Sequence, residues 1–268
     1  MACGDTGTCM TVLDWQSFCS NSPPIPPSAM TIGVFDGVHR GHQELIRRVV
    51  NQNAGLRPVA ITFQTNPKVL LRRSSHGGDI TSLRQKLGLL EALGIDQVVL
   101  IDFSGNFSKL RGIEFVDLLK ERGNLRYLVV GSDFRCGYRL DTDVVLLKKM
   151  NDESGIITEV VPPVVRGDLP ISSSRIRAAI ASGDLVEASN LLGRNVEIDL
   201  VDVPPTPRSD GIVFNVRATA RLTPPNGRYP VLLKYGQGLQ MKEAFIEIEK
   251  GMVKIPYQID CESIEFIV

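Results

Sequence analysis

The sequence predicts an α/β fold in which a mostly parallel, doubly wound sheet is followed by a small antiparallel β domain. The first observation is a series of apolar, β-rich runs bounded by turn residues, at 30–35, 58–63, 97–101, 127–131 and 156–161. The second is a series of helical patterns between these runs, at 42–53, 82–93, 112–122 and 141–150. Strands that alternate with helices are typical of a parallel sheet with helices on its faces.

The helix over 82–93 has specific support. Either Thr81 or Ser82 can cap its first turn, and Gly94 is a natural residue to follow its last turn. Leucines at the spacing of one helical face, Leu83, Leu87 and Leu90, predict the side that packs on the sheet.

The third observation is a change of pattern after Arg194. Apolar residues then alternate with polar ones, as in Val216, Ala218, Ala220 and Leu222 against Arg217, Thr219 and Arg221, and in Ile246 and Ile248 against Glu247 and Glu249. Turn residues at 224–227 and 236–238 separate such runs. We therefore expect a first domain over 1–193 and a small antiparallel β domain over 194–268.

The composition excludes several classes of protein. The chain of 268 residues has 30 basic and 30 acidic side chains, so a formal net charge of zero gives no reason to expect nucleic acid or a membrane as a partner. Residues 1–20 lack the pattern of a secretory signal, and no apolar run approaches the length of a membrane span. Five cysteines form no C-x-x-C pair, namely Cys3, Cys9, Cys19, Cys136 and Cys261. An odd number of unpaired cysteines favours free thiols in a reducing compartment, so we expect a cytoplasmic protein.

Residues Thr31 to Gln43, T-I-G-V-F-D-G-V-H-R-G-H-Q, hold two of the three histidines of the chain. The run predicts a strand, a glycine-rich turn and a helix start, and His39 and His42 are spaced to share one face of that helix. An anion bound at the helix N-terminus would meet both imidazoles. Glycines at 33, 37 and 41 would let phosphates approach the backbone. The alternative is that one histidine caps the helix and the other is solvated.

Two other segments place polar residues where a phosphate or a ring could bind. In Ser172-Ser173-Ser174-Arg175-Ile176-Arg177, hydroxyls at a predicted helix start and two arginines could hold phosphates, or they could be an ordinary cap with solvated arginines. Apolar strands also run into Phe63-x-x-Asn66-Pro67 and into Gly131-Ser132-Asp133-Phe134-Arg135. Such strand ends bind ligands in α/β sheets, although Phe134 could be core and Asn66 a turn former.

Together these segments resemble the bacterial bifunctional riboflavin kinase/FMN adenylyltransferases, the FAD synthetases, which are relatives of other H-x-G-H nucleotidylyltransferases. Ile61–Leu71 is similar to the family's T-F-x-P-H-P element, Leu128–Arg135 to V-V-G-x-D-F-R-F-G, and Ile171–Arg177 to I-S-S-T-R-I-R. Gly183–Arg194 resembles the G-D-x-x-x-A-x-x-L-L-G-R helix that follows. The sequence departs from the family pattern at Val34, Asn66, Cys136 and Thr142.

The resemblance implies a Rossmann-like fold and an enzyme that makes FAD and pyrophosphate from FMN and ATP, with Mg²⁺ assisting. It implies catalytic roles for His39, His42 and Arg177. It implies that ATP is bound by Gly33, Phe35, Asp36, Gly37, Gly41, Ser173, Ser174 and Arg175. It implies that the flavin is bound by Phe63, Asn66, Pro67, Asp133, Phe134 and Arg135. No protein ligand for a metal is expected, because Mg²⁺ would be held by the phosphates.

The C-terminal segment lacks the G-x-P-T-A-N motif of the family's riboflavin kinase, since Pro204-Pro205-Thr206-Pro207 is only a fragment of it. We therefore expect a reduced, kinase-like barrel over 194–268 without riboflavin kinase activity, which supports the first domain or mediates assembly. Three alternatives remain open. The chain could be bifunctional, could adenylylate another phosphorylated acceptor such as a pantetheine or nicotinamide nucleotide, or could be a non-catalytic regulator that binds flavin or ATP.

Overall fold

The fold is known from a computed structural model that describes residues 10–20, 25–67, 77–103, 107–236 and 238–268. The chain forms two compact units. The parallel-sheet unit consists of Met1–Phe35, Gly41–Arg73 and Leu87–Val164. The β-rich unit consists of Asp36–Arg40, Ser74–Lys86 and Val165–Val268. Each unit therefore contains segments from distant parts of the sequence, and the expected boundary at residues 193 and 194 stays a prediction.

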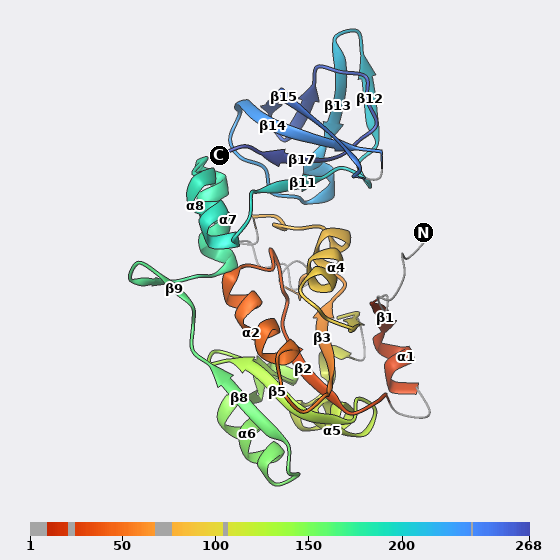
Figure 1. Ribbon diagram of the computed structural model, residues 1–268, viewed down its shortest axis with the longest axis vertical. Helices are drawn as coiled ribbons and strands as arrows, with labels where there is room; N and C mark the ends of the chain where they lie inside the picture. Colours follow the sequence, from red (N-terminus) through yellow and green to blue (C-terminus); the bar gives the residue numbers. More distant parts are fainter. Residues whose placement is uncertain (1–9, 21–24, 68–76, 104–106, 237) are drawn as a thin grey trace. The chain divides into compact units, whose positions relative to one another are not determined.

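The parallel-sheet unit is built on a six-stranded sheet in the order β1-β4-β3-β2-β5-β8, with every neighbouring pair parallel (Figure 1). Its strands are β1 (Thr11–Asp14), β2 (Ser28–Ile32), β3 (Arg57–Phe63), β4 (Gln97–Ile101), β5 (Leu125–Gly131) and β8 (Ile157–Val161). The prediction of a mostly parallel sheet is confirmed. Every residue of β2 is buried, as expected for a central strand covered on both faces.

The helices between these strands match the expected ranges closely. They are α2 (Arg40–Val50), α4 (Leu83–Ala92), α5 (Gly112–Glu121) and α6 (Val144–Asp152). Helix α6 begins later than the predicted residue 141 because Asp143 is its N-cap, accepting hydrogen bonds from the amides of Val145 and Leu146 at 3.1 Å. Gly94 follows α4 with a φ of +89°, as expected for a residue after a helix end.

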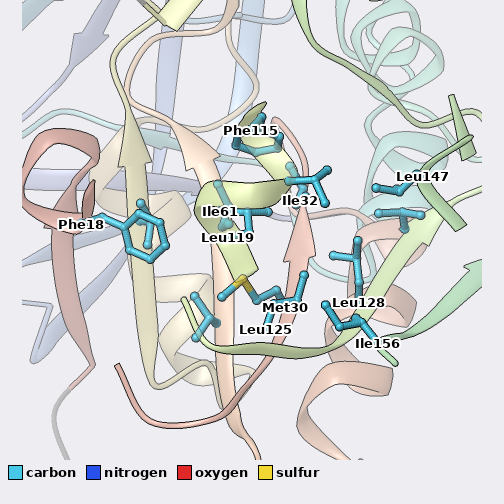
Figure 2. Close-up of a cluster of buried hydrophobic side chains, with 14 of the residues drawn as sticks. Phe18, Met30, Ile32, Ile61, Phe115, Leu119, Leu125, Leu128, Leu147 and Ile156 are labelled. Atoms are coloured by element: carbon cyan, nitrogen blue, oxygen red, sulfur yellow. The ribbon is translucent and has the colours of Figure 1, made fainter. Parts of the chain in front are cut away.

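One face of the parallel sheet packs against α1 (Trp15–Ser20), α5 and α6. Figure 2 shows Met30 and Ile32 from the central strand β2 in a buried cluster with Phe18 of α1, Phe115 of α5 and Leu147 of α6. Dispersion and apolar burial over such a cluster fix the sheet and therefore the places where its strands end. Strand β1 and helix α1 were not predicted. Residues Thr11–Asp14 are mostly exposed and do not alternate between buried and exposed, so the strand lacks the usual sequence pattern.

The β-rich unit contains an antiparallel sheet of seven strands in the order β11-β17-β14-β15-β16-β13-β12. These strands are β11 (Glu197–Asp199), β12 (Pro205–Arg208), β13 (Gly211–Asn215), β14 (Gly227–Tyr235), β15 (Gln240–Glu249), β16 (Met252–Ile255) and β17 (Cys261–Phe266). The expected C-terminal antiparallel sheet is confirmed. Ile246 and Ile248 are buried in β15 between exposed glutamates, as their alternation predicts.

The strand predicted from the alternation over 216–222 is wrong. Strand β13 ends at Asn215, the 3-10 turn η3 covers Val216–Thr219, and Ala220 has a left-handed φ of +55°. Alanine and arginine have weak strand preference, so the alternation alone does not hold this segment in a sheet. Instead, Arg221 forms an isolated bridge with Asp79.

Two short helices lie in the β-rich unit, and the first has the serine cap that the sequence allows. Helix α7 (Ser173–Ser182) begins after the N-cap Ser172 and ends at Gly183, whose φ is +83°. Helix α8 (Leu185–Leu192) follows directly, capped by Asp184. A short hairpin of β9 (Val165–Arg166) and β10 (Leu169–Pro170) precedes them.

Two smaller findings concern membranes and thiols. In the part of the chain that the structure describes, no helix is long and apolar enough to cross a membrane. Cys19, Cys136 and Cys261 are free thiols, and burial raises the pKa of Cys136 and Cys261 to about 12. Cys3 and Cys9 lie outside the described residues.

Candidate functional site

The loop between β2 and α2 carries the predicted nucleotide-binding residues. Its first part is fixed to the parallel sheet, because the Gly33 amide donates to the Ile61 carbonyl at 3.0 Å and Thr62 Oγ1 donates to the Val34 carbonyl at 3.0 Å. Phe35 and Val38 have positive φ angles of 51° and 39° although neither is glycine. Such backbone strain persists only where the surroundings over-determine it, and it gathers at functional sites.

His42 lies in the first turn of α2, in the parallel-sheet unit. Its ring is half-buried and meets the ring of Phe35 edge-on, with centroids 5.2 Å apart. Phe35 itself is fully buried, and its ring contact restricts the orientation of the imidazole. Gly41 directly precedes His42 in the same helical turn. The helix N-terminus at this point carries positive potential, which is suited to an anion.

Asp36 is the centre of the arrangement in the β-rich unit. It is only 6% exposed, and its Oδ1 accepts hydrogen bonds from the amides of Ile80 at 3.0 Å and Thr81 at 3.3 Å. Its other oxygen, Oδ2, forms an ion pair with Arg177. Burial raises the pKa of Asp36 against the opposing effect of the Arg177 charge. Both carboxylate oxygens of Asp36 therefore bond to protein donors, and these bonds hold the loop in place.

Gly37 continues this organisation. Its amide donates to Thr81 Oγ1 at 3.1 Å, and its carbonyl accepts from Arg194 Nη2 at 2.8 Å. Its φ is +80°, and a Cβ would lie 3.1 Å from Ile80 Cγ2 and 3.2 Å from Leu192 Cδ2. Both the backbone angle and the space therefore require glycine here.

Helix α7 brings the predicted serines and arginines to the same place. Ser172 caps the helix by accepting from the Arg175 amide at 3.3 Å, and Ser173 Oγ donates to the Asp36 carbonyl at 3.0 Å. Arg177 donates through Nε to the Gly78 carbonyl at 2.8 Å, besides its ion pair with Asp36. Two anchors thus fix the guanidinium of Arg177 in a buried position.

Arg175, two residues earlier, has different partners. Its Nη1 donates to the carbonyls of Arg166 at 3.1 Å and Leu169 at 3.0 Å, and its Nη2 pairs with Glu187 at 2.5 Å. These bonds tie the β9–β10 hairpin to α7 and α8. Ser174 is exposed at the helix start. Phosphate binding by Ser174 and Arg175 stays a prediction. In this structure the Arg175 guanidinium bonds to the carbonyls of the hairpin.

His39 is buried beside two guanidinium groups. It is 6% exposed, and burial together with the charges of Arg194 and Arg177 lowers its pKa to about 4. The imidazole is therefore neutral at pH 7 and donates one N–H. Burial also lowers the pKa of Arg194 to about 10, and its Nη1 has no hydrogen-bond partner among the described residues. A buried guanidinium with a spare donor is suited to an anion.

Lys86 and Asp79 complete the charged cluster, and neither was predicted. Lys86 lies in the first turn of α4 and is 7% exposed, and burial lowers its pKa to about 8 although Asp36 and Asp79 oppose that shift. One sequence signal was available, because Lys86 occupies the face of α4 that Leu83 and Leu90 define, where a lysine is unexpected. Arg194 is the last residue of the Gly183–Arg194 motif, but its burial was not predicted, since a residue after a helix end is usually solvated.

The predicted flavin residues lie at the carboxyl ends of strands in the parallel-sheet unit, where open α/β sheets bind ligands. Phe63 ends β3 and packs edge-on against Phe103 and Phe107, with ring centroids 5.9 and 6.3 Å apart. Asn66 follows and is 8% exposed, and Pro67 is half-buried. A buried amide beside a set of aromatic rings is suited to a planar, hydrogen-bonding ligand.

The other predicted flavin residues follow β5. Asp133 and Arg135 are exposed, whereas Phe134 is half-buried and packs against the hydrophobic core of the unit. The turn is closed by a bond from the Phe134 amide to the Gly131 carbonyl at 3.0 Å. The neighbouring strands β2 and β5 mark the point where the strand order changes direction along the chain. This geometry agrees with either a ligand-binding or a core role for Phe134.

No protein metal centre is found among the residues that the structure describes. No group of three His, Cys, Asp or Glu side chains in those ranges is arranged to hold a metal ion. The cationic residues of the β-rich unit instead fit negatively charged oxygens. Arg177, Arg194, Lys86 and the neutral donor His39 are the groups that could receive them.

Comparisons with known proteins agree with this geometry. Residues 23–175 match the family model described as FAD synthetase. The chain is 31% identical over 170 residues to the bifunctional riboflavin kinase/FMN adenylyltransferase of Buchnera aphidicola, covering 62% of this chain and 54% of that protein. It is 32% identical over 208 residues to the protein of the same name from Escherichia coli, covering 75% of this chain and 66% of that protein. The chain thus spans between half and two thirds of these relatives.

A solved structure shares the fold over nearly the whole chain. It is titled a macrolide-efflux protein from Streptococcus pneumoniae, and it covers 96% of this chain and 89% of its own with a TM-score of 0.79 and 24% identity. At this identity the likeness concerns the fold alone.

Proposed function

The chain belongs to the FAD synthetase family, and from this membership we propose that it is an FMN adenylyltransferase. In the proposed reaction the phosphate of FMN attacks the α-phosphorus of ATP, the bond to the β-phosphate oxygen breaks, and pyrophosphate leaves with FAD as the other product. The observation that carries the proposal is the buried cationic cluster of Arg177, Arg194 and Lys86 with His39, which suits a polyphosphate.

Two anions must meet in this reaction, so we propose that the chain works by alignment and charge neutralisation. Arg177 receives the departing phosphates, because Asp36 and Gly78 hold its guanidinium in one orientation. His39 donates a hydrogen bond as a neutral imidazole, since its pKa is lowered to about 4. His42, held edge-on by Phe35, donates to the phosphate oxygens as charge develops.

The remaining predicted contacts stay part of the proposal. For ATP we propose backbone contacts along the loop and contacts from the start of α7. The loop residues are Gly33, Phe35, Asp36, Gly37 and Gly41, and the α7 residues are Ser173, Ser174 and Arg175. For the flavin we propose the strand-end residues Phe63, Asn66, Pro67, Asp133, Phe134 and Arg135. Aromatic edges and a buried amide at the end of β3 support this side of the proposal.

Magnesium fits the proposal as a component of the substrate. Mg²⁺ keeps several waters and is usually bound through substrate phosphates with one or two carboxylates. We propose that it arrives as the Mg-ATP complex, where it neutralises charge on the phosphates. Arg177, Arg194 and Lys86 then neutralise the charge that remains.

The test is chromatographic analysis of purified protein incubated with Mg-ATP and either FMN or riboflavin. FAD from FMN and no product from riboflavin is the expected result. FMN formed from riboflavin would mean that the C-terminal sheet is a riboflavin kinase after all. No FAD from FMN would overturn the proposal, and parallel incubations with phosphopantetheine and nicotinamide mononucleotide would then identify another acceptor. ATP or FMN binding without turnover would indicate a regulator.

A further inference from the structure

The segment over residues 77–86 bonds to residues 220–222, which directly follow the η3 turn. The Asp79 amide donates to the Ala220 carbonyl at 2.9 Å, and the Leu222 amide donates to the Asp79 carbonyl at 3.1 Å. A Cβ on Gly78 would lie 3.0 Å from the Ala220 carbonyl oxygen and 3.1 Å from the Leu222 nitrogen, and Gly78 has a φ of +112°. The close approach of these two backbones therefore depends on glycine at 78.

Asp199 of strand β11 holds the other end of the same segment. Its carboxylate is fully buried, accepts a hydrogen bond from Ser82 Oγ, and pairs with Arg84 Nη2 at 2.6 Å. Ser82 is also the N-cap of α4 and forms a capping box with Gln85, with both bonds at 3.1 Å. The sheet thus fixes where α4 begins and, one turn later, where Lys86 lies.

The same segment also bonds to the proposed catalytic groups. The amides of Ile80 and Thr81 bond Asp36, Thr81 Oγ1 accepts from the Gly37 amide, and the Gly78 carbonyl accepts from Arg177 Nε. Arg177 therefore has two anchors, the Gly78 carbonyl and the Asp36 carboxylate, and the segment sets the position of both. Hydrogen bonds and the intervening backbone of residues 78–82 thus connect β11 and the residues after η3 to the guanidinium of Arg177.

We propose that the C-terminal sheet takes part in adenylyl transfer by fixing residues 78–86, so that Asp199 and Gly78 are positioning residues for Arg177. The inference rests on the proposed function and adds a role for a sheet in which we find no kinase motif. Its physical reason is that misplacing a catalytic group by about 1 Å can cost roughly 10²-fold in rate. A segment that is bonded both to Asp199 of the sheet and to the anchors of Arg177 transmits a shift of the sheet to the guanidinium.

The first test compares Gly78→Ala with Gly167→Ala. Gly167 also has a positive φ, +61° against +112° at Gly78, but a Cβ at 167 meets nothing within 4 Å, so the control places an alanine at positive φ without the clash. We expect Gly78→Ala to lower kcat for FAD formation roughly tenfold, which is part of the roughly 10²-fold cost of misplacing a catalytic group by about 1 Å. Calorimetry should show pyrophosphate binding weakened by a similar factor. The KM for FMN stays unchanged in both variants, and a merely structural role would not produce this selectivity.

The second test compares Asp199→Asn with Asp210→Asn, which removes the exposed ion pair with Lys254 in the same sheet. Rates are normalised to folded protein by circular dichroism, because loss of a buried carboxylate also lowers stability. We expect the same selective loss in Asp199→Asn and wild-type kinetics in Asp210→Asn. If the wild type makes FAD and each variant behaves as its control, the inference is overturned and the proposed function stands. If the wild type makes no FAD, both are overturned.

Discussion

The two units hold their candidate residues in different ways. In the parallel-sheet unit, Phe63 ends β3 and Arg135 begins the short strand β6 (Arg135–Cys136) soon after β5 ends, so the backbone topology places them. In the β-rich unit, Asp36, Arg177 and Arg194 are placed by hydrogen bonds between side chains and backbone from segments far apart in the sequence. The first arrangement should tolerate loss of a side chain without loss of stability, and the second should not.

The strongest test of this difference is Arg177→Met. Arg177 and Asp36 form a buried pair with side chains 11% and 7% exposed, so the variant leaves an uncompensated buried carboxylate. We expect the free energy of unfolding to fall by roughly 3–5 kcal/mol in urea titrations. The double variant Asp36→Asn with Arg177→Met should recover part of that loss. The matched control Arg47→Met breaks the exposed pair with Glu44 and should cost less than about 1 kcal/mol. Equal losses in the two arginine variants would contradict the comparison.

His42→Ala tests the parallel-sheet unit, where we expect a large loss of activity with little loss of stability. Loss of one preorganised donor to developing charge should lower kcat by roughly 10²–10³. Because His42 is half-buried and its ring contacts Phe35 at an edge, the thermal unfolding midpoint should change little. Steady-state FAD formation and circular dichroism on the same preparation measure both quantities. Near-normal turnover with a normal fold would remove His42 from the proposed mechanism.

His39 gives a test through pH. Its pKa is about 4 in the fold, below the value of roughly 6.5 expected in the unfolded chain, so the unfolded chain binds the proton first as the pH falls. Its contribution to stability is complete above the unfolded pKa and is lost as the pH falls toward the folded pKa. Between about pH 7 and pH 4.5, the wild type should lose roughly 2 kcal/mol more than His39→Gln in urea unfolding. Identical pH profiles would show that the imidazole is not held neutral by its surroundings.

Arg135→Ala should have the smallest effect on stability. The side chain is exposed, so the free energy of unfolding should change by less than about 0.5 kcal/mol. The KM for FMN should nevertheless rise several-fold if the strand-end residues after β5 border the flavin. Fluorescence titration of FMN provides an independent affinity. An unchanged affinity for FMN would remove Arg135 from the proposed flavin side and leave the strand-end argument to Phe63 and Asn66.

The sequence predicts the elements whose signals are local. The central strands are continuous apolar runs between turn residues, and the helix caps at Ser82 and Ser172 follow from short-range chemistry. Strand β1 gives no such signal, because three of its four residues are exposed and parallel pairing with β4 alone defines it. The alternation over 216–222 is misleading, because small residues can alternate without entering a sheet.

The candidate site divides in the same way. Motif residues such as His39 and Arg177 are recognisable from their spacing, whereas their supports depend on contacts across the fold. Asp199 lies more than a hundred positions from Ser82 and Arg84, as the separations of 117 and 115 show, and no local pattern connects them. Lys86 offers one hint in its apolar helical face. The difference between Arg175 and Arg177 depends on partners that only the folded chain reveals.

The β-rich unit combines Asp36–Arg40 and Ser74–Lys86 with the chain after Val165. During synthesis on a ribosome, the first two segments emerge well before the strands and helices that hold them. Contacts between such distant positions form slowly, since the intervening chain must be closed into loops first. Asp36 therefore remains without Arg177 through most of translation. A nascent chain can have a formed parallel sheet and still lack the ordered pair of Asp36 and Arg177. The proposed activity should therefore be among the last properties that this protein acquires.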